Sequence, residues 1–258
     1  MMSHITILIL NWNGADLLKK CLESVMEINY SNYSVVVIDN HSSDNSIELI
    51  KNNFSKVKII CLDKNYGFAG GYNKCFDQLD KNKTENVLLL NNDTIVDSNI
   101  LISLNNAINK YGSNHIYGGK IFYHNHPNKI WYAGGKIKLS LFKIYHIGIR
   151  KMDSNRYSIP LETDYITGCC LFTSLKVIHK LGGFDEQFNM YAEDVDLCLR
   201  ARNEGIFCYF WPDAKLWHHV SASLGGEFSL NKICKKFSSK VKLLSKYFLL
   251  KINIIYIK

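Results

Sequence analysis

The stretch that decides the fold is ITILIL (residues 5–10), followed at once by the polar turn NWNG (residues 11–14). An unbroken apolar run of strand length indicates a strand that is buried on both faces of a sheet. A second such run, VVVI (residues 35–38), ends in the polar segment DNHSSD (residues 39–44). Between the two runs, apolar residues recur at helical spacing over residues 18–26. Strand, helix and strand in this order predict a mostly parallel sheet with helices on both faces.

The alternation continues through the first half of the chain and then becomes irregular. Helices are expected over residues 44–54 and 68–79, strands over 57–62 and 87–90, and Ser98 is expected to cap the next helix. Further strands are expected over residues 116–123, 130–139, 165–173 and 207–211, the last closed by Pro212 and Asp213, and a helix begins near Glu193. The fold class is therefore α/β, with a regular first half and a mixed second half.

The composition is that of a globular protein in a reducing compartment. The chain has 258 residues, of which 47% are hydrophobic and 21% are charged. A chain of this size can bury about three-quarters of its unfolded surface without disulfide support. Its 8 cysteines form no Cys-x-x-Cys pair, and the first apolar run is too short for a signal peptide or a membrane-spanning helix. We therefore expect free thiols and a cytoplasmic location.

The net charge of +8 is concentrated at the C-terminus. Residues 231–258 contain eight lysines and no acidic residue, interleaved with apolar residues. This composition is typical of a basic amphipathic helix that lies on an anionic membrane, and peripheral membrane contact is one expectation. The alternative is a terminal helix whose apolar side packs on the domain while its lysines are solvated. No nucleic-acid-binding motif accompanies the charge, so nucleic acid is not an expected partner.

Three polar clusters follow predicted strands, at residues 11–14, 39–44 and 91–93. Ligands of parallel α/β sheets bind beyond the carboxyl ends of the strands, so the three clusters are expected to meet on one edge. Candidate ligand contacts there are Asn11, Asn13, Asp39 and Asn92. A carboxylate such as that of Asp39 can accept a hydrogen bond from the N3–H of uracil or thymine, a donor that cytosine lacks. The alternative is that Asp39, like Asp44, caps the following helix.

A glycine-rich turn, NYGFAGGYN (residues 65–73), leads into the helix expected over residues 68–79. Glycines such as Gly70 permit close backbone approach, and a helix N-terminus favours an anion such as a diphosphate. Asn65 and Asn73 bracket the turn and are further candidates for this contact. The spacing is not G-x-G-x-x-G, the P-loop lysine is absent, and a tight loop would have the same composition.

Acidic residues at two further positions suggest metal and acid–base chemistry. Asp93, at a strand end, can hold Mg²⁺ or Mn²⁺ against two phosphates, although a turn also favours aspartate. His218 follows the last predicted strand and is either a metal ligand or a packed side chain. Glu193 and Asp194 open a helix, where acids complement the helix dipole, and adjacent carboxylates can raise each other's pKa as a general base requires.

Taken in order, these segments resemble the family 2 glycosyltransferases, in particular their rhamnosyltransferase-like and galactofuranosyl-like branch. The resemblance covers residues 5–224. It is carried by LNWNG (10–14), VIDNHSSD (37–44), NYGFAGGYN (65–73), LNND (90–93), TGCC (167–170), GGFD (182–185), EDVDL (193–197) and PDA (212–214) before His218. The resemblance implies a GT-A fold, a Rossmann-like and mostly parallel sheet flanked by helices, with a mixed acceptor-binding half.

The resemblance also implies roles for individual residues. Asp39 reads the nucleotide base, and Asp93 is the metal-binding member of a D-x-D motif whose first position is Asn91. Asp194, with Glu193 beside it, matches the catalytic base, and Thr167 and Gly168 match the loop beneath the acceptor. The cofactor implied is Mg²⁺ or Mn²⁺, held by Asp93, the diphosphate and His218.

The implied organisation is a nucleotide-sugar-binding half (residues 1–110), an acceptor-binding and catalytic half (111–225) and a basic tail (226–258). The tail lacks the arginine of the Tyr-x-x-Arg-Asn-like helix that many relatives carry. The implied reaction is inverting hexosyl transfer in cell-surface polysaccharide synthesis. The first expected donor is dTDP-rhamnose and the second a UDP-sugar, with a saccharide or lipid-linked saccharide as acceptor.

Three rival functions make different demands on the sequence. A nucleotidyltransferase would carry a glycine-rich loop with Arg and Lys after its first strand, and a Rossmann oxidoreductase would carry G-x-G-x-x-G there. The segment NWNG (residues 11–14) provides neither. A catalytically inactive nucleotide- or sugar-binding module of the same fold is the remaining alternative. Such a module would be expected to lack Asp93 or Asp194, and both are present.

Overall fold

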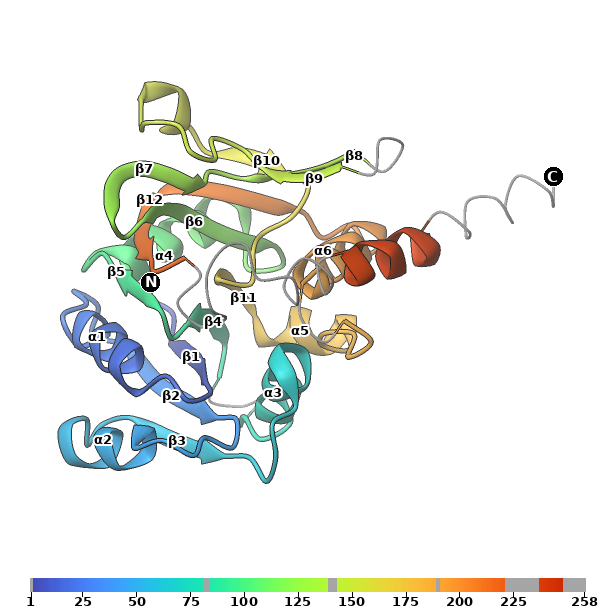
Figure 1. Cartoon of the computed structure of the whole chain (residues 1–258). Helices are drawn as coiled ribbons and strands as arrows, with labels where there is room; N and C mark the ends of the chain where they lie inside the picture. The colour runs from blue at the N-terminus through green and yellow to red at the C-terminus, as the bar shows by residue number, and fades with distance from the viewer. Residues whose placement is uncertain (1, 81–83, 139–142, 189–190, 221–236, 248–258) are drawn as a thin grey trace.

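The computed structural model describes residues 2–80, 84–138, 143–188, 191–220 and 237–247, which form helices packed on both faces of one large sheet (Figure 1). The first half of the chain contains β1 (Ile5–Asn11), α1 (Ala15–Met26), β2 (Tyr33–Asp39), α2 (Ser46–Asn53), β3 (Lys58–Cys61), α3 (Gly67–Phe76), β4 (Asn86–Asn91), β5 (Thr94–Val96) and α4 (Ile100–Tyr111). The second half contains β6 (Ile116–Tyr123), β7 (His126–Tyr132), β8 (Gly135–Lys138), β9 (Lys143–His146), a 3₁₀ helix (Asn155–Tyr157), β10 (Leu161–Thr163), β11 (Cys170–Ser174), α5 (Leu175–Leu181), α6 (Glu193–Asn203) and β12 (Cys208–His218). Residues 237–247 form one more helix, called here the tail helix.

The large sheet joins both halves of the chain in the order β10-β12-β6-β11-β4-β1-β2-β3. Strands β4, β1, β2 and β3 are parallel, as predicted, and β11 joins them antiparallel through β4. The register aligns Asn11 with Asp39 and Leu10 with Asn91. The polar clusters that follow β1, β2 and β4 therefore share one edge of the sheet, which confirms that expectation.

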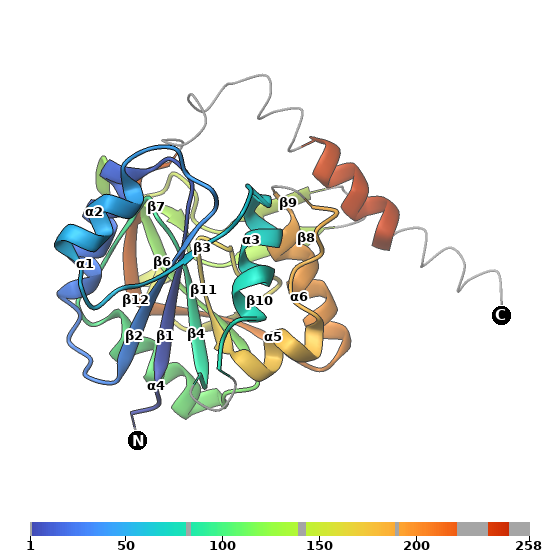
Figure 2. The same cartoon turned by 90° about the horizontal axis from the view of Figure 1, so that it is seen from below.

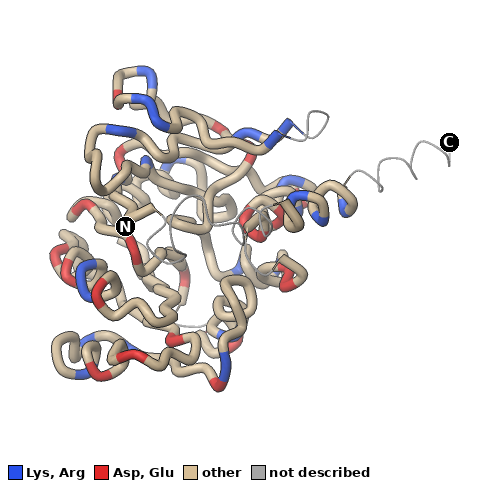
Figure 3. The backbone as a smooth tube through the Cα atoms, viewed as in Figure 1, with Lys and Arg blue, Asp and Glu red and all other residues tan. Residues whose placement is uncertain are grey.

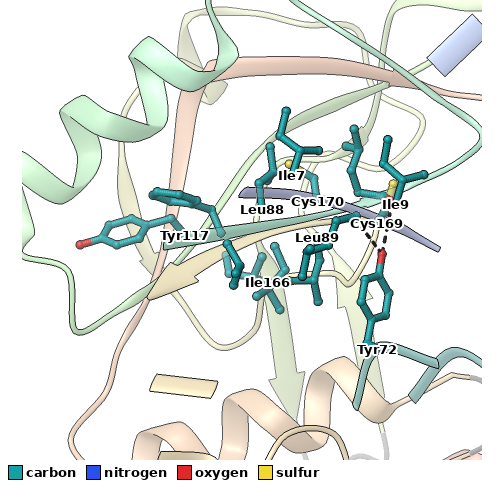
Figure 4. Packing of buried hydrophobic residues seen from close by; sticks show 14 of the residues in the cluster. Ile7, Ile9, Tyr72, Leu88, Leu89, Tyr117, Ile166, Cys169 and Cys170 are labelled. Atoms are coloured by element: carbon teal, nitrogen blue, oxygen red, sulfur yellow. Dashed lines mark hydrogen bonds between the residues drawn. The ribbon is translucent and has the colours of Figure 1, made fainter. Parts of the chain in front are cut away.

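Helices cover the sheet on both sides (Figure 2): α1 and α2 lie on one face, and α3, α5 and α6 lie on the other. The central strands β1 and β4 are buried almost throughout because each of their faces is covered. Tyr72 of α3 is fully buried, and its hydroxyl donates to the carbonyls of Leu8 (3.4 Å) and Leu90 (3.2 Å). Figure 4 shows Tyr72 among the buried residues of the core. This side chain fixes α3 across the two strands that end at the polar edge.

Several predicted boundaries were wrong, each for a local reason. Ser98 does not cap α4; Asn99 occupies the N-cap position, and its amide donates to Asp97. The predicted strand over residues 130–139 is divided at Gly134, whose φ of 105° ends β7 before β8 begins. The last strand does not stop at Pro212, because an irregularity in its pairing with β6 between Trp211 and Lys215 accommodates the proline, and β12 runs on to His218.

The predicted free thiols are confirmed for the seven cysteines in the described part of the chain, and Cys234 lies outside it. Among the described residues, no helix has both the length and the apolarity needed to cross a membrane.

Candidate active site

Asp39, Asn11 and Asn92 form a linked polar group at the carboxyl ends of β2, β1 and β4. Asn11 is fully buried, and its side-chain amide donates to Asp39 (3.4 Å) and to the Ser42 hydroxyl (3.3 Å). The side-chain oxygen of Asn11 accepts a hydrogen bond of 2.7 Å from the Asn92 side-chain amide. The other oxygen of Asp39 accepts the backbone amide of Ser42 (2.9 Å). These contacts fix the orientation of the Asp39 carboxylate.

Asn13 and Asp44 hold the two loops around this group together. The side-chain oxygen of Asn13 accepts the amide of Ser43 (2.7 Å), and Asn13 has a left-handed φ of 49°. The Asp44 carboxylate accepts the amides of Ala15, at the start of α1, and of Ser46, at the start of α2. The predicted cap was wrong by one position, because the N-cap of α2 is Asn45, but the Asp44 carboxylate binds the first residue of two helices. Hydrogen bonds from Ser46 and Ala15 outweigh the effect of burial and lower the pKa of Asp44.

Asn65 is held by Asn40, a residue that the sequence interpretation did not select. Asn40 is buried, and its amide donates to Asn65 (2.9 Å) and to the Gly67 carbonyl, while its oxygen accepts the Tyr66 amide (2.9 Å). Asn40 thus fastens the glycine-rich turn to the end of β2. Its position directly after Asp39 was the available signal, but an asparagine in a loop gives no indication of how many bonds it makes.

Gly70 and Asn73 lie on the side of α3 that faces the loop after α5. The Asn73 side chain donates to Phe184 O (2.9 Å) and Glu186 Oε1 (3.0 Å), and it accepts the Phe184 amide (2.9 Å). A β-carbon at Gly70 would lie 3.5 Å from the Glu186 carboxylate. The side-chain hydrogen bonds of Asn73 therefore run to the second half of the chain, and the role of Gly70 and Asn73 in donor binding stays a prediction.

Asp93 and His218 meet at the end of β12, as the resemblance implies for a metal site. Both are buried, and His218 Nε2 lies 3.1 Å from Asp93 Oδ1. Apart from this contact, neither Asp93 Oδ1 nor His218 Nδ1 has a hydrogen-bond partner among the described residues. Two ligands at about 2.1 Å from one octahedral cation lie about 3 Å apart, so this pair fits a divalent cation. No group of three His, Cys, Asp or Glu side chains that could hold a metal ion occurs in the described ranges.

Two further histidines border this pair. The His219 amide donates to Asp93 O (2.8 Å), and the His219 ring stacks on that of His124 with centroids 3.5 Å apart. Burial and the neighbouring His124 lower the pKa of His219, which favours its neutral form. His124 was not among the predicted residues because it lies far from His219 along the chain and reaches it only through the parallel pairing of β6 with β12.

Asp194 and Glu193 open α6; Glu193 is buried and Asp194 is half-buried. One Asp194 oxygen accepts the Gly168 amide (2.9 Å) and the other accepts the Val195 amide (2.8 Å). Burial raises the pKa of Asp194, although the amides of Gly168 and Val195 and the Thr167 side chain act in the opposite direction. Burial and the charge of Asp194 raise the pKa of Glu193 well above its usual range. Both carboxyls are thus better proton acceptors than ordinary ones.

The helix start that carries these carboxyls is held in an unusual backbone conformation. Tyr191 and Ala192 have φ values of 72° and 74°, a left-handed region that non-glycine residues seldom adopt. The N-cap residue is Ala192, whose methyl side chain cannot cap the helix by a hydrogen bond. Such strain costs about 1–3 kcal/mol per residue and persists only where surrounding structure enforces it, most often at functional sites.

The segment 167–169 connects the Glu193–Asp194 pair to the end of β4. Gly168 donates to Asp194, and the next residue, Cys169, accepts the Asn91 amide (3.2 Å). A β-carbon at Gly168 would lie 2.8 Å from the Phe68 ring of α3, so a larger residue there would require that ring to shift. The predicted base, acceptor loop and metal-side turn therefore belong to one continuous region.

Comparison with known proteins identifies the family of this chain. A family model described as "Glycosyltransferase like family 2" matches residues 3–232. The "dTDP-rhamnosyl transferase RfbF" of Shigella flexneri is 24% identical over 221 residues, which cover 85% of this chain and 70% of that protein. The "Uncharacterized protein y4gI" of Sinorhizobium fredii is 25% identical over 237 residues, covering 86% of this chain. The chain spans only 25% of the length of y4gI.

Among solved structures, GalNAc-T7 crystallised with UDP, GalNAc and Mn²⁺ matches with a TM-score of 0.69 at 15% identity. The match covers 88% of this chain and 45% of that one. At this identity the similarity concerns the fold, which confirms the expected GT-A architecture. Because the family model spans nearly the whole chain, this protein belongs to glycosyltransferase family 2.

Proposed function

We propose that this protein is an inverting, metal-dependent glycosyltransferase of cell-surface polysaccharide synthesis. The proposal rests above all on one observation: the half-buried Asp194 carboxylate accepts the Gly168 amide, and the segment that contains Gly168 also contacts Asn91. A proton acceptor is thereby held beside the edge where Asp39 and Asp93 lie. The proposed donor is dTDP-rhamnose, in line with the similarity to RfbF, with a UDP-sugar as the second candidate. The proposed acceptor is a saccharide or a lipid-linked saccharide.

In the proposed reaction, Asp194 accepts the proton of an acceptor hydroxyl as the oxygen attacks the anomeric carbon. The bond between that carbon and the nucleoside diphosphate breaks, the diphosphate leaves with the bonding electrons, and the configuration inverts. The raised pKa of Asp194 favours proton uptake, and the Gly168 and Val195 amides keep its carboxylate oriented. Glu193 limits the ionisation of the pair, because two adjacent carboxylates, one of them buried, resist carrying two charges.

Asp93 and His218 are the side chains that would hold Mg²⁺ or Mn²⁺. The cation, when bound, supplies positive charge to the diphosphate oxygens as the leaving group develops. Asp39, fixed by Asn11 and Ser42, is the proposed acceptor for the N3–H of thymine or uracil. Asn13, Asn65 and Asn92 complete the proposed donor site by shaping its loops.

The donor assignment is tested by the melting temperature of the protein with dTDP, UDP, GDP and CDP, each with and without Mn²⁺. A nucleotide at about a hundred times its dissociation constant stabilises the folded state by roughly 2.7 kcal/mol. For a chain of this size the melting temperature should rise by several degrees. A metal-dependent rise with dTDP or UDP and none with CDP is expected. Equal shifts with all four nucleotides would contradict base reading by Asp39.

The inactive-module alternative makes a different prediction for the same protein. It predicts nucleotide binding without turnover when the protein receives dTDP-rhamnose or a UDP-sugar and a panel of saccharide and lipid-linked acceptors. Transfer of radiolabelled sugar that requires Asp194 excludes it. Nucleotide binding with no transfer to any acceptor of the panel would favour it.

We also propose that the tail helix contacts the inner face of the cell membrane. Phe237 and Val241, four residues apart, are 69% and 48% exposed, whereas Leu243 on the other side of the helix is fully buried. The helix thus presents apolar side chains outward while it packs on the domain. Lysines near an anionic surface contribute about 1 kcal/mol each.

Co-sedimentation with phosphatidylglycerol vesicles, but not with phosphatidylcholine vesicles, is expected. The variant Phe237→Ser/Val241→Ser should reduce it, and equal sedimentation with both lipids would contradict the proposal.

A further inference from the structure

Asp196, two positions after Asp194, joins α6 to the tail helix. Its side chain is fully buried and accepts hydrogen bonds from three other side chains. Arg200 Nε on the same helix binds one carboxylate oxygen (2.8 Å). Lys246 Nζ (2.6 Å) and the Tyr247 hydroxyl (2.8 Å), both from the tail helix, bind the other. The Asp196 carboxylate, in the first turn of α6, is therefore bound both by its own helix and by a segment that is distant in the sequence.

The same group of charges includes the loop between α5 and α6. Lys246 also binds Asp185 (2.7 Å), and Arg200 donates to the carbonyls of Leu181 and Gly183. The two carboxylates and two cations balance in charge. Although burial acts in the opposite direction, these hydrogen bonds lower the pKa of Asp185 and raise that of Lys246. Removing Lys246 would leave Asp185 without its ion-pair partner and Asp196 with Arg200 as its remaining cation. A buried charge that is incompletely compensated lowers the stability of the folded state.

Apolar contacts accompany these ion pairs. Leu243 of the tail helix is fully buried, and Lys246 lies 5.7 Å from the centre of the Phe188 ring. Figure 1 shows the tail helix beside α6, and Figure 3 shows acidic positions next to its lysines. The tail helix is therefore docked on the element that carries Asp194.

The position of this contact matters because the start of α6 is strained. Tyr191 and Ala192 hold left-handed backbone conformations directly before Glu193 and Asp194. A strained helix start relaxes unless neighbouring structure holds it. Asp196 lies within the first turn of α6 and its carboxylate is held from outside the helix by Lys246 and Tyr247.

We propose that Lys246 and Tyr247 are positioning residues for the catalytic base. Through Asp196 they hold the first turn of α6 so that the Asp194 carboxylate stays against the Gly168 amide. The tail helix is then part of the catalytic apparatus. This inference rests on the proposed role of Asp194 as the base.

The test compares Lys246→Met, Tyr247→Phe and Lys246→Arg with the control Lys242→Met in the full-length protein. Lys242 lies on the same helix, is exposed and binds only the Gln187 carbonyl (3.0 Å) among the described contacts. Two quantities are measured: amide hydrogen exchange over residues 193–198, and the kcat and donor KM of sugar transfer. Tyr247→Phe removes a single hydroxyl, so it remains informative if Lys246→Met does not fold.

Lys246→Met is expected to speed exchange in the first turn of α6 and to lower kcat about tenfold to a hundredfold, since misplacement of a catalytic group by about 1 Å has effects of that size. Donor KM should change less than about twofold, because the donor edge is untouched. Tyr247→Phe should have a smaller effect of the same kind, Lys246→Arg should restore most of kcat, and Lys242→Met should behave as wild type.

Unchanged exchange and kcat in both Lys246→Met and Tyr247→Phe would overturn the proposal, as would equal losses in Lys246→Met and Lys242→Met. If the wild-type protein transfers no sugar, the proposed function fails. The exchange comparison then still decides whether the tail helix holds α6: faster exchange in Lys246→Met supports the anchoring, and unchanged exchange refutes it.

Discussion

At the scale of single residues, the site is governed by how burial and hydrogen bonding compete at each carboxyl. Asp44 accepts hydrogen bonds that outweigh burial, so its pKa is lowered. Asp194 also accepts two amides, yet burial prevails and its pKa is raised. The two carboxyls thus have opposite properties, one suited to tying helices together and the other to accepting a proton.

Asp194→Asn is expected to abolish most turnover and to leave donor binding nearly intact. The amide cannot accept the hydroxyl proton, and a positioned general base contributes about 10² to 10⁴ in rate. Donor binding should persist because the described hydrogen bonds of Asp194 run to Gly168 and Val195, not to the group around Asp39. Steady-state kcat and calorimetric dTDP affinity provide the measurement, with the exposed Asp213→Asn as the control. Full turnover with lost donor binding would refute the assignment.

Glu193→Gln is expected to change how stability depends on pH. The folded-state pKa of Glu193 is raised, so the folded state holds this proton more tightly than the unfolded state, whose value is about 4.3. Below about pH 4 Glu193 is protonated in both states and does not reduce the free energy of unfolding. As pH rises through the raised pKa, the wild type loses stability. The glutamine variant has no such loss. Its melting temperature relative to wild type should therefore increase from pH 4 to pH 7; parallel curves would contradict the raised pKa.

At the scale of helices and strands, the prediction from sequence succeeded where one period dominated. The apolar runs of β1, β2 and β4 and the residues at their ends were found because a strand buried on both faces leaves an unbroken signal. The short strand β5 and the helix α5 were missed because three and seven residues carry too little periodicity. The contacts of Asn40, Asn73 and His124 were missed because they depend on partners supplied by tertiary packing.

The turn that begins α1 offers a test of how loop packing affects nucleotide binding. Gly14 has φ −129°, which alanine tolerates, but a β-carbon there would lie 2.5 Å from Asn92 Nδ2 and 3.0 Å from Asn11 Oδ1. Gly14→Ala should therefore break the hydrogen bond between Asn92 and Asn11. We expect dTDP or UDP affinity to fall about tenfold, or ~1.4 kcal/mol. The melting temperature should change little, because alanine also restricts the unfolded chain.

The matched control for this variant is Gly205→Ala, after the end of α6. Gly205 has φ 71°, and a β-carbon there would meet none of the described residues within 4 Å, so alanine is strained at this position without touching the site. It should destabilise the protein by about 1–2 kcal/mol and leave nucleotide affinity unchanged. Calorimetric titration and thermal unfolding of both variants separate the two effects. Wild-type affinity in Gly14→Ala would show that the Asn92–Asn11 contact is dispensable.

At the scale of the whole molecule, the two proposed functional halves, divided near residue 110, share one continuous sheet. Strand β4 of the first half pairs with β11 of the second half from Asn86 to Leu90, and β5 pairs with β12. The core residues of both halves form one cluster, part of which Figure 4 shows. The proposed nucleotide-binding half therefore depends on the acceptor-binding half for its structure as well as for its chemistry.

We accordingly expect a fragment of residues 1–110 not to fold alone. Without β11, the apolar strand β4 becomes an edge with unpaired backbone groups, a feature that promotes aggregation, and β5 has no partner strand. The intact chain should unfold in a single transition whose calorimetric and van't Hoff enthalpies agree, as for one cooperative unit. Near-ultraviolet circular dichroism of the fragment should show no fixed tertiary structure, with the full-length protein as the reference. A fragment that unfolds cooperatively and binds dTDP or UDP would instead establish two independent domains.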